Sequence, residues 1–307
     1  MERDGKRVYG GVSGVELAFE SFDLGEGVVL RRTYAHLMSP RMMAFARPGP
    51  HGYHLGPLKA AKGGFSFDIE IEVRAPEATC LGDNFGAEET IWWIATLLRL
   101  AKVPFLSVPV LSDHPFQSVP NIEDEPTFKP FETERRIFQA SDPSKRVLDE
   151  NLLSWVKEKW IPAGRLINSN PRFHTALKAF DSATVRGRTS AALLALWGGL
   201  EQLFAPSPGE LRFRVASLLA SYLESQGSAR FDLYKRILKL YNERSIAAHT
   251  AQELDTGPLV NTYVLMRNAL VRMIDENKIP SQDDLEGLLF GCAVPNEELQ
   301  PTASGGG

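Results

Sequence analysis

Hydrophobic and polar residues alternate along much of the first half of the chain, a pattern typical of half-buried strands. The clearest case is FSFDIEIEV at residues 65–73, where every second residue is apolar. Residues 14–34 predict two shorter strands around a turn at Gly25 and Gly27, and residues 104–111 predict another strand. This half is therefore expected to contain a sheet.

A helix is predicted over residues 88–102, which begin with acidic residues and end with basic ones, as the helix dipole favours. This helix overlaps the most apolar stretch of the chain, residues 91–110. Two basic residues and two prolines interrupt that stretch: Arg99, Lys102, Pro104 and Pro109. We therefore expect a buried helix followed by a strand, and no membrane span.

Beyond residue 144 the apolar positions recur at helical spacing, and no strand is expected. The clearest stripe lies in residues 189–204, with apolar residues spaced by three, four and one. The whole pattern predicts an α+β fold class, with an N-terminal mixed α/β domain followed by an all-α helical bundle. The expected boundaries are 1–143 for the first domain, 144–294 for the bundle and 295–307 for a disordered tail.

Composition narrows the class of protein. The 307 residues are 43% hydrophobic, and the two cysteines form neither a disulfide framework nor a zinc pattern. The polar start MERDGKR leads to no apolar run, so we expect a cytoplasmic protein. The net charge is −4, yet residues 171–250 carry eleven Lys and Arg against six Asp and Glu. That local excess indicates either an anionic partner or a solvated helix face.

Two features of the predicted bundle are not obviously explained by packing of its core. Gly198 and Gly199 lie inside a predicted helix, where each costs roughly 1 kcal/mol relative to alanine. Close helix packing and a site entrance beside Glu201 are both possible reasons. The second feature is Arg244, which extends the apolar stripe of its helix and must be partnered if it is buried, by Glu201 or Glu243.

Four sequence elements occur in the order found in the HEPN superfamily. They are ALLALWGGLEQLF, LRFRVASLL, LYNERSIAAHT and LMRNALVRMIDENKIPSQDDLEGLLF, within residues 170–290. This part of the chain resembles Apea-like HEPN domains, whose "LE-x-LF" and "LY-x-x-RS-x-x-x-H" elements it reproduces. It departs from the family at Thr250, where a glycine commonly follows the histidine.

The resemblance implies a metal-independent endoribonuclease that needs no cofactor. Arg244 and His249 would be catalytic, with Ser245, Glu201 and Tyr241 in support. Histidine exchanges protons near neutral pH, and arginine stabilises charge on phosphate. The candidates for RNA binding are the arginines of the basic segment: Arg186, Arg188, Arg212 and Arg214.

The resemblance also implies partners. HEPN ribonucleases usually act as pairs, often as effectors in prokaryotic antiviral defence or toxin–antitoxin systems. A homodimer would also ease a geometric problem, because residues five apart on a helix point about 140° from each other. The N-terminal domain would then sense a trigger or dock a regulatory protein.

Two alternatives remain open for the bundle. It is either a non-catalytic HEPN module that binds RNA, nucleotide or protein, or an unrelated helical protein in which Arg244 neutralises a carboxylate. Metal hydrolysis is less favoured, because the six histidines form no helical pair with ligand spacing. RRTYAH repeats the same arginine–histidine spacing at Arg31 and His36, inside a predicted strand, and is expected to be coincidence.

Overall fold

The computed structural model describes residues 7–53, 57–82, 85–123, 125–134, 136–138, 146–185, 187, 189–205, 209–249 and 255–292; for 39–44, 58, 60, 61–65, 248 and 249 the description covers the backbone alone. The chain divides into two compact units. Unit 1 comprises Met1–Pro171 and Thr184–Gly187, and unit 2 comprises Arg172–Ala183 and Arg188–Gly307. Strands and helices are both present, which confirms the predicted α+β class. The predicted tail, 295–307, lies outside the described residues.

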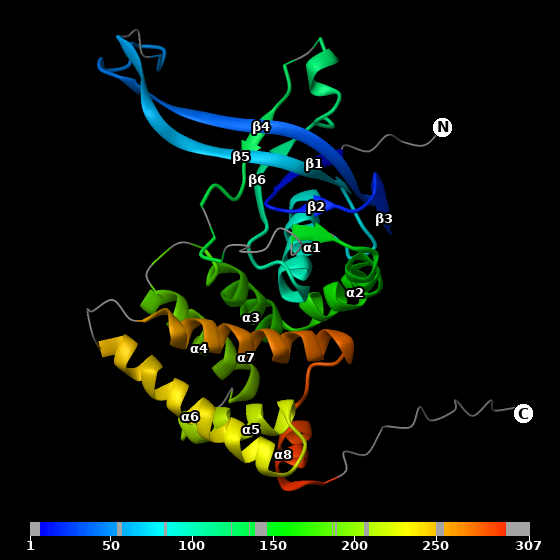
Figure 1. Cartoon of the computed structure of the whole chain (residues 1–307), viewed down its shortest axis with the longest axis vertical. Coiled ribbons are helices and arrows are strands. Elements are labelled where there is room, and N and C mark those ends of the chain that lie inside the picture. The colour runs from blue at the N-terminus through cyan, green and yellow to red at the C-terminus, as the bar shows by residue number, and fades with distance from the viewer. Residues whose placement is uncertain are drawn as a thin grey trace, which may run out of the picture. The chain divides into compact units, whose positions relative to one another are not determined.

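Unit 1 contains a six-stranded antiparallel sheet in the order β3-β4-β5-β1-β6-β7 (Figure 1). Its strands are β1 (Arg7–Ser13), β3 (Ser21–Gly25), β4 (Val28–Ala44), β5 (Leu58–Pro76), β6 (Ser107–Ser112) and β7 (Phe128–Pro130). The predicted alternation at 65–73 lies in β5. The predicted turn joins β3 to β4, and Gly25 and Gly27 both have positive φ, which glycine adopts without a steric penalty.

A second, parallel pair joins β2 (Glu16–Leu17) to β8 (Val147–Leu148). β8 corrects the expectation that no strand follows residue 144. A strand of two residues is too short to display an alternating pattern, so hydrophobic periodicity could not reveal it.

Helix α1 (Ala87–Ala101) packs against β1, β5 and β6. The stretch predicted to be a helix followed by a strand is indeed α1 followed by β6. Among the described helices, none combines the length and the apolar character needed to cross a membrane.

Helix α2 (Glu150–Ser169) belongs to unit 1, although the sequence placed its residues in the bundle. The indole Nε1 of buried Trp93 in α1 donates to the carbonyl of Trp160 at 2.8 Å. Trp160, also buried, donates through its own Nε1 to the carbonyl of Leu24 in β3 at 2.9 Å. These contacts hold α2 against α1 and β3, so the division between the units falls after residue 171 and not after 143.

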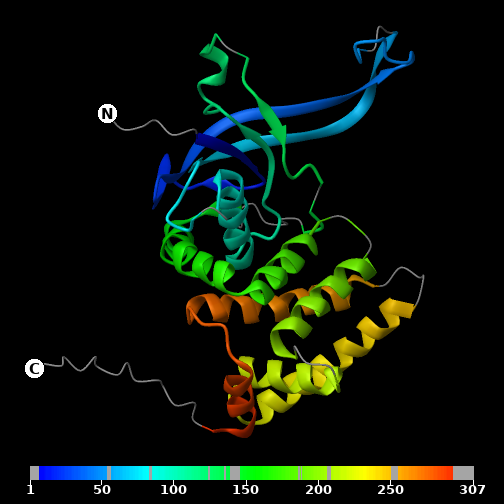
Figure 2. The same ribbon diagram turned by 180° about the vertical axis from the view of Figure 1, so that it is seen from behind.

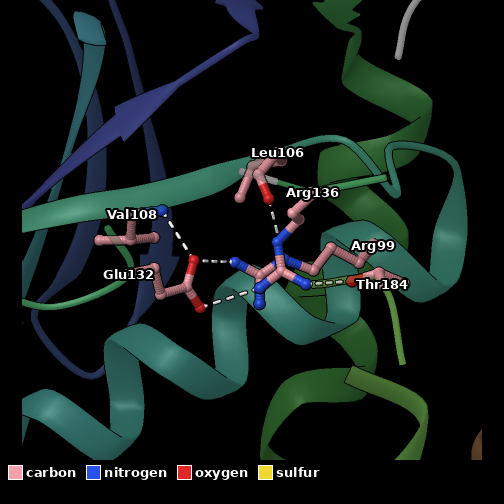
Figure 3. Close-up of polar contacts among 6 residues, drawn as sticks. All are labelled: Arg99, Leu106, Val108, Glu132, Arg136 and Thr184. Atoms are coloured by element: carbon pink, nitrogen blue, oxygen red, sulfur yellow. Dashed lines mark hydrogen bonds and ion pairs between the residues drawn. The ribbon is translucent and has the colours of Figure 1, made fainter. Parts of the chain in front are cut away.

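A buried polar network joins α1 to the sheet (Figure 3). Arg99 of α1 is fully buried, and its Nε donates to the carbonyl of Leu106 at 3.0 Å. Its Nη2 pairs with the carboxylate of Glu132, which also accepts from the backbone N–H of Val108 in β6 at 2.8 Å. Glu132 therefore fixes both the helix and the strand.

The same carboxylate holds a second buried arginine, Arg136, whose Nη2 lies 3.0 Å from Glu132 Oε1. Arg136 Nη1 also donates to the hydroxyl of Thr184 (Figure 3). The backbone N–H of Ile137 donates to the carbonyl of Thr184 at 2.7 Å. These bonds explain why residues 184–187 belong to unit 1, although the chain on both sides of them belongs to unit 2.

Unit 2 consists of helices in its described part (Figures 1 and 2): α3 (Pro171–Ser182), α4 (Thr189–Phe204), α5 (Leu211–Leu223), α6 (Ser228–His249), α7 (Thr256–Asp275) and α8 (Gln282–Phe290). The sequence predicted helices throughout this part of the chain, and the stripe predicted in residues 189–204 lies in α4. Helix α4 contacts α5, α6 and α7. Its predicted apolar stripe is buried throughout: Leu193, Leu196, Trp197, Leu200, Leu203 and Phe204.

The two glycines of α4 have different surroundings. A Cβ on Gly199 would lie 2.5 Å from Met266 Cε of α7 and 3.3 Å from Ala176 Cα of α3. A Cβ on Gly198 would have no neighbour within 4 Å. Close helix packing therefore accounts for Gly199, whereas Gly198 has no steric role in this packing.

This difference gives a test of the packing. Gly199→Ala and Gly198→Ala gain the same helix propensity. The difference between their free energies of unfolding therefore measures the steric penalty at Gly199, which is about 1–3 kcal/mol for overpacking. We expect Gly199→Ala to be the less stable of the two by that amount in urea unfolding, with Gly198→Ala at or slightly above the wild type. Equal stabilities would show that the side chains around position 199, Met266 above all, accommodate a methyl group, and that close packing does not require a glycine there.

Candidate active site

The predicted arginine lies near the end of α6, on the side of that helix which packs against α4. Tyr241 lies one turn before it, and its ring meets Trp197 of α4 edge-on, with centroids 5.0 Å apart. Both rings are buried. This aromatic contact fixes the register of α6 against α4 and so places Arg244 beside Glu201.

Glu201 is the partner of both polar groups on this part of α6. Its Oε1 lies 3.2 Å from Nη2 of Arg244 and accepts a hydrogen bond from the Tyr241 hydroxyl at 2.8 Å. The guanidinium also lies over the Tyr241 ring, 5.4 Å from its centroid. Of the two carboxylates that the sequence offered as partners, Glu201 and Glu243, the structure selects Glu201.

The ion pair of Arg244 and Glu201 is only partly removed from water. The side chain of Arg244 is 29% exposed and that of Glu201 is 17% exposed. Nε of Arg244 is buried and makes no hydrogen bond to any described residue. Arg244 is therefore held at one nitrogen by Glu201, while part of its side chain stays accessible to a ligand.

Burial, and after it the hydrogen bond to the Glu201 carboxylate, together raise the pKa of Tyr241 to about 12. Tyr241 is therefore protonated at neutral pH. In that form it donates to Glu201 and does not serve as a base.

Ser245, one of the predicted supporting residues, makes a hydrogen bond within its own helix. Its hydroxyl donates to the carbonyl of Tyr241 at 3.3 Å, one turn back in the same helix. Such back-bonding is common for serine inside helices.

His249 is the last residue of α6, and its side chain lies outside the described part of the structure. The helix continues without a break from Arg244 to His249, so the two positions are separated by about 140° around its axis. On a single copy of α6 the two backbone positions therefore lie on different sides of the helix.

The four arginines proposed for RNA binding are described only in part. Arg186 and Arg188 lie outside the described residues. Arg212 and Arg214 lie in α5, where Arg212 is exposed and Arg214 half-buried. Arg212 lines an open groove of about 640 Å³ with Glu210, Leu211, Phe213, Tyr234 and Leu238.

Aromatic residues in and beside this groove were not predicted from the sequence. Phe213 is 51% exposed and Phe231 is 59% exposed, and both rings contact Tyr234, at 6.3 and 6.4 Å between centroids. Lys235 Nζ lies 4.6 Å from the centre of the Phe231 ring. Aromatic residues flanked by basic ones, in RFR and ARFDLYKR, were the available signal.

The second arginine–histidine spacing does not form a comparable site. His36 Nδ1 lies 2.7 Å from Asp68 Oδ1 on the exposed surface of β4 and β5. Arg31 lines a separate pocket in unit 1. Within the described part of the chain, no three His, Cys, Asp or Glu side chains come together as metal ligands would.

Comparisons with known proteins give no relative for this chain: no family model, no curated protein and no solved structure matches it.

The Glu201 contact leads to a spectroscopic prediction. Glu201→Gln removes the charge that stabilises protonated Tyr241, so the pKa of Tyr241 should fall below about 12 yet stay above the usual value, because burial remains. Ultraviolet titration, with the spectrum of Tyr241→Phe subtracted, measures this pKa. Glu243→Gln is the matched control and should leave it unchanged; an equal fall in both variants would contradict the assigned pairing.

Proposed function

We propose that unit 2 is a metal-independent endoribonuclease of the HEPN type, with Arg244 and His249 as its catalytic residues. The observation that carries this proposal is the setting of Arg244. It is held by Glu201, remains 29% exposed and lies five residues before a histidine that ends the same helix. The ordered HEPN-like elements in the sequence support the same reading.

The chemistry suits the two side chains. The 2′-hydroxyl oxygen of RNA attacks the adjacent phosphorus and the bond to the 5′-oxygen breaks, giving a 2′,3′-cyclic phosphate and a 5′-hydroxyl. His249 takes the proton from the 2′-hydroxyl or gives one to the leaving oxygen. Arg244 donates hydrogen bonds to the phosphate oxygens as negative charge builds on them.

Helix geometry makes a second copy of the chain part of the proposal. Because α6 is continuous between Arg244 and His249, one copy presents them about 140° apart. A symmetric homodimer brings the arginine of one copy and the histidine of the other to the same phosphate.

The groove at α5 and α6 supplies features that suit a single-stranded RNA. Bases stack on exposed aromatic rings and phosphates contact arginine and lysine side chains. Phe213, Tyr234 and Arg212 line the groove. The groove supports RNA as the substrate, with Arg212 and Arg214 as contributors to its binding.

One observation favours the alternative, a non-catalytic module that binds RNA, nucleotide or a partner protein. Glu201 neutralises Arg244 in this conformation, and such an ion pair also serves structure alone. Catalysis requires that the guanidinium of Arg244 contact a phosphate while Glu201 stays paired with its Nη2.

We further propose, by analogy with HEPN proteins, that the chain is a cytoplasmic effector in prokaryotic antiviral defence or a toxin–antitoxin system. Unit 1 would then sense a trigger or dock a regulatory protein that holds the nuclease silent. Full activity of the purified protein with no partner would remove the basis for that silencing role.

The test is cleavage of a labelled single-stranded RNA in EDTA by the purified protein. We expect cyclic-phosphate ends, with about 10²–10³-fold less cleavage in Arg244→Ala and about 10²–10⁴-fold less in His249→Ala. RNA binding by each variant is measured in parallel, so that lost catalysis is separated from lost affinity.

Arg236→Ala is the control, because Arg236 is an exposed arginine on the same helix. It should cleave at close to the wild-type rate. Cleavage by Arg244→Ala and His249→Ala as fast as by this control would reject the proposed site. RNA binding without cleavage in the wild type would favour the non-catalytic module.

A further inference from the structure

Unit 1 contains a small pocket lined by three arginines. Its volume is about 210 Å³, and the residues around it are Arg7, Tyr9, Val29, Arg31, Glu72, Arg74 and Pro115. The proposed nuclease uses none of them, so the pocket is a feature of the sheet in its own right.

Strand register explains why these side chains gather. Arg74 of β5 pairs with Tyr9 of β1 on one side and with Val29 of β4 on the other, and Arg31 of β4 pairs with Glu72 of β5. Side chains two residues apart on a strand share a face. Three adjacent strands thus bring the pocket residues together on one face of the sheet.

This face is the one opposite α1. A Cβ on Gly10 would lie 2.7 Å from Ile91 of α1, so this position of β1 faces the helix. A Cβ on the next position, Gly11, would lie 2.8 Å from the ring of Phe116, so this position faces the other way. Tyr9 is two residues from Gly11 and shares its face, which α1 therefore leaves uncovered.

Basic side chains outnumber acidic ones around the pocket. Three arginines and one carboxylate, that of Glu72, line it. Glu72 is buried, and its Oε2 already accepts from the backbone N–H of Phe116 at 2.7 Å. Arg74 Nε donates to the carbonyl of Gly27 at 3.3 Å, and the positive charges of Arg31 and Arg74 both act on the Glu72 carboxylate.

We propose that this pocket binds a small phosphate dianion, with Arg31 and Arg74 donating to its oxygens. Guanidinium groups bind phosphate with paired, charge-assisted hydrogen bonds, and Arg31 and Arg74 each bring one positive charge to the pocket. At about 210 Å³ the pocket lies below the usual ~300–1,000 Å³ of sites for larger ligands, so it fits the phosphate group and little more. The inference does not depend on the proposed nuclease.

Isothermal titration calorimetry at constant ionic strength tests this site, with inorganic phosphate and AMP as probes and chloride as the reference. We expect saturable binding of phosphate. Tighter binding of AMP would identify the phosphate of a larger molecule as the ligand, and equal binding would identify the free ion; both outcomes support the site.

Arg31→Gln and Arg74→Gln should each weaken phosphate binding about tenfold or more, because a charged hydrogen-bond donor is lost. Arg31→Lys keeps the positive charge but loses the paired N–H donors of the guanidinium. Its affinity for phosphate should lie between those of the wild type and Arg31→Gln. Arg165→Gln, an exposed arginine of α2 in the same unit, is the control and should bind as the wild type does.

Two outcomes would overturn the proposal. One is binding that does not exceed the chloride reference, and the other is equal affinity in Arg31→Gln, Arg74→Gln and Arg165→Gln. Circular dichroism of each variant separates lost binding from lost folding. RNA cleavage is not a readout here, so failure of the phosphate site and failure of the proposed nuclease are distinguishable.

Discussion

The carboxylate of Glu132 holds two buried arginines, and the arrangement of unit 1 depends on it. It pairs with Arg99 of α1 and with Arg136, and it also accepts the backbone N–H of Val108 in β6. Transfer of ions from water costs several kcal/mol for each ion, so such a network is tolerable only when its members are hydrogen-bonded. Through Thr184 it also fixes the segment where the chain briefly returns from unit 2.

Unit 2 also contains an ion pair between a glutamate and a helical arginine, but this pair is less buried. Glu201 of α4 holds Arg244 of α6, as Glu132 holds Arg99. The Arg99 side chain is fully buried, whereas the Arg244 side chain is 29% exposed. A buried arginine can only serve the fold, while a partly exposed one can also meet a ligand. This difference in exposure is the physical basis for proposing a function for the second pair and a structural role for the first.

Local periodicity predicted the longer helices and the long strand β5, but it revealed neither the two-residue strand β8 nor which elements pack together. The alternation in β5 and the stripe of α4 were evident in the sequence, because each depends on residues close together in the chain. The assignment of α2 failed because Trp160 bonds to Leu24, 136 residues away. For Arg244 the sequence left Glu201 and Glu243 open, and only the packing of Tyr241 on Trp197 decides between them. The three-arginine pocket depends on strand register, which no single segment reveals.

The central claim is that one RNA-cleaving site takes Arg244 from one copy of the chain and His249 from another. Mixing purified Arg244→Ala and His249→Ala proteins, each inactive alone, tests it directly. If dimers exchange freely, half are mixed and each mixed dimer keeps one intact site of two, so roughly a quarter of wild-type cleavage should return. No recovery, with exchange verified by differently tagged copies, would contradict a site shared between copies.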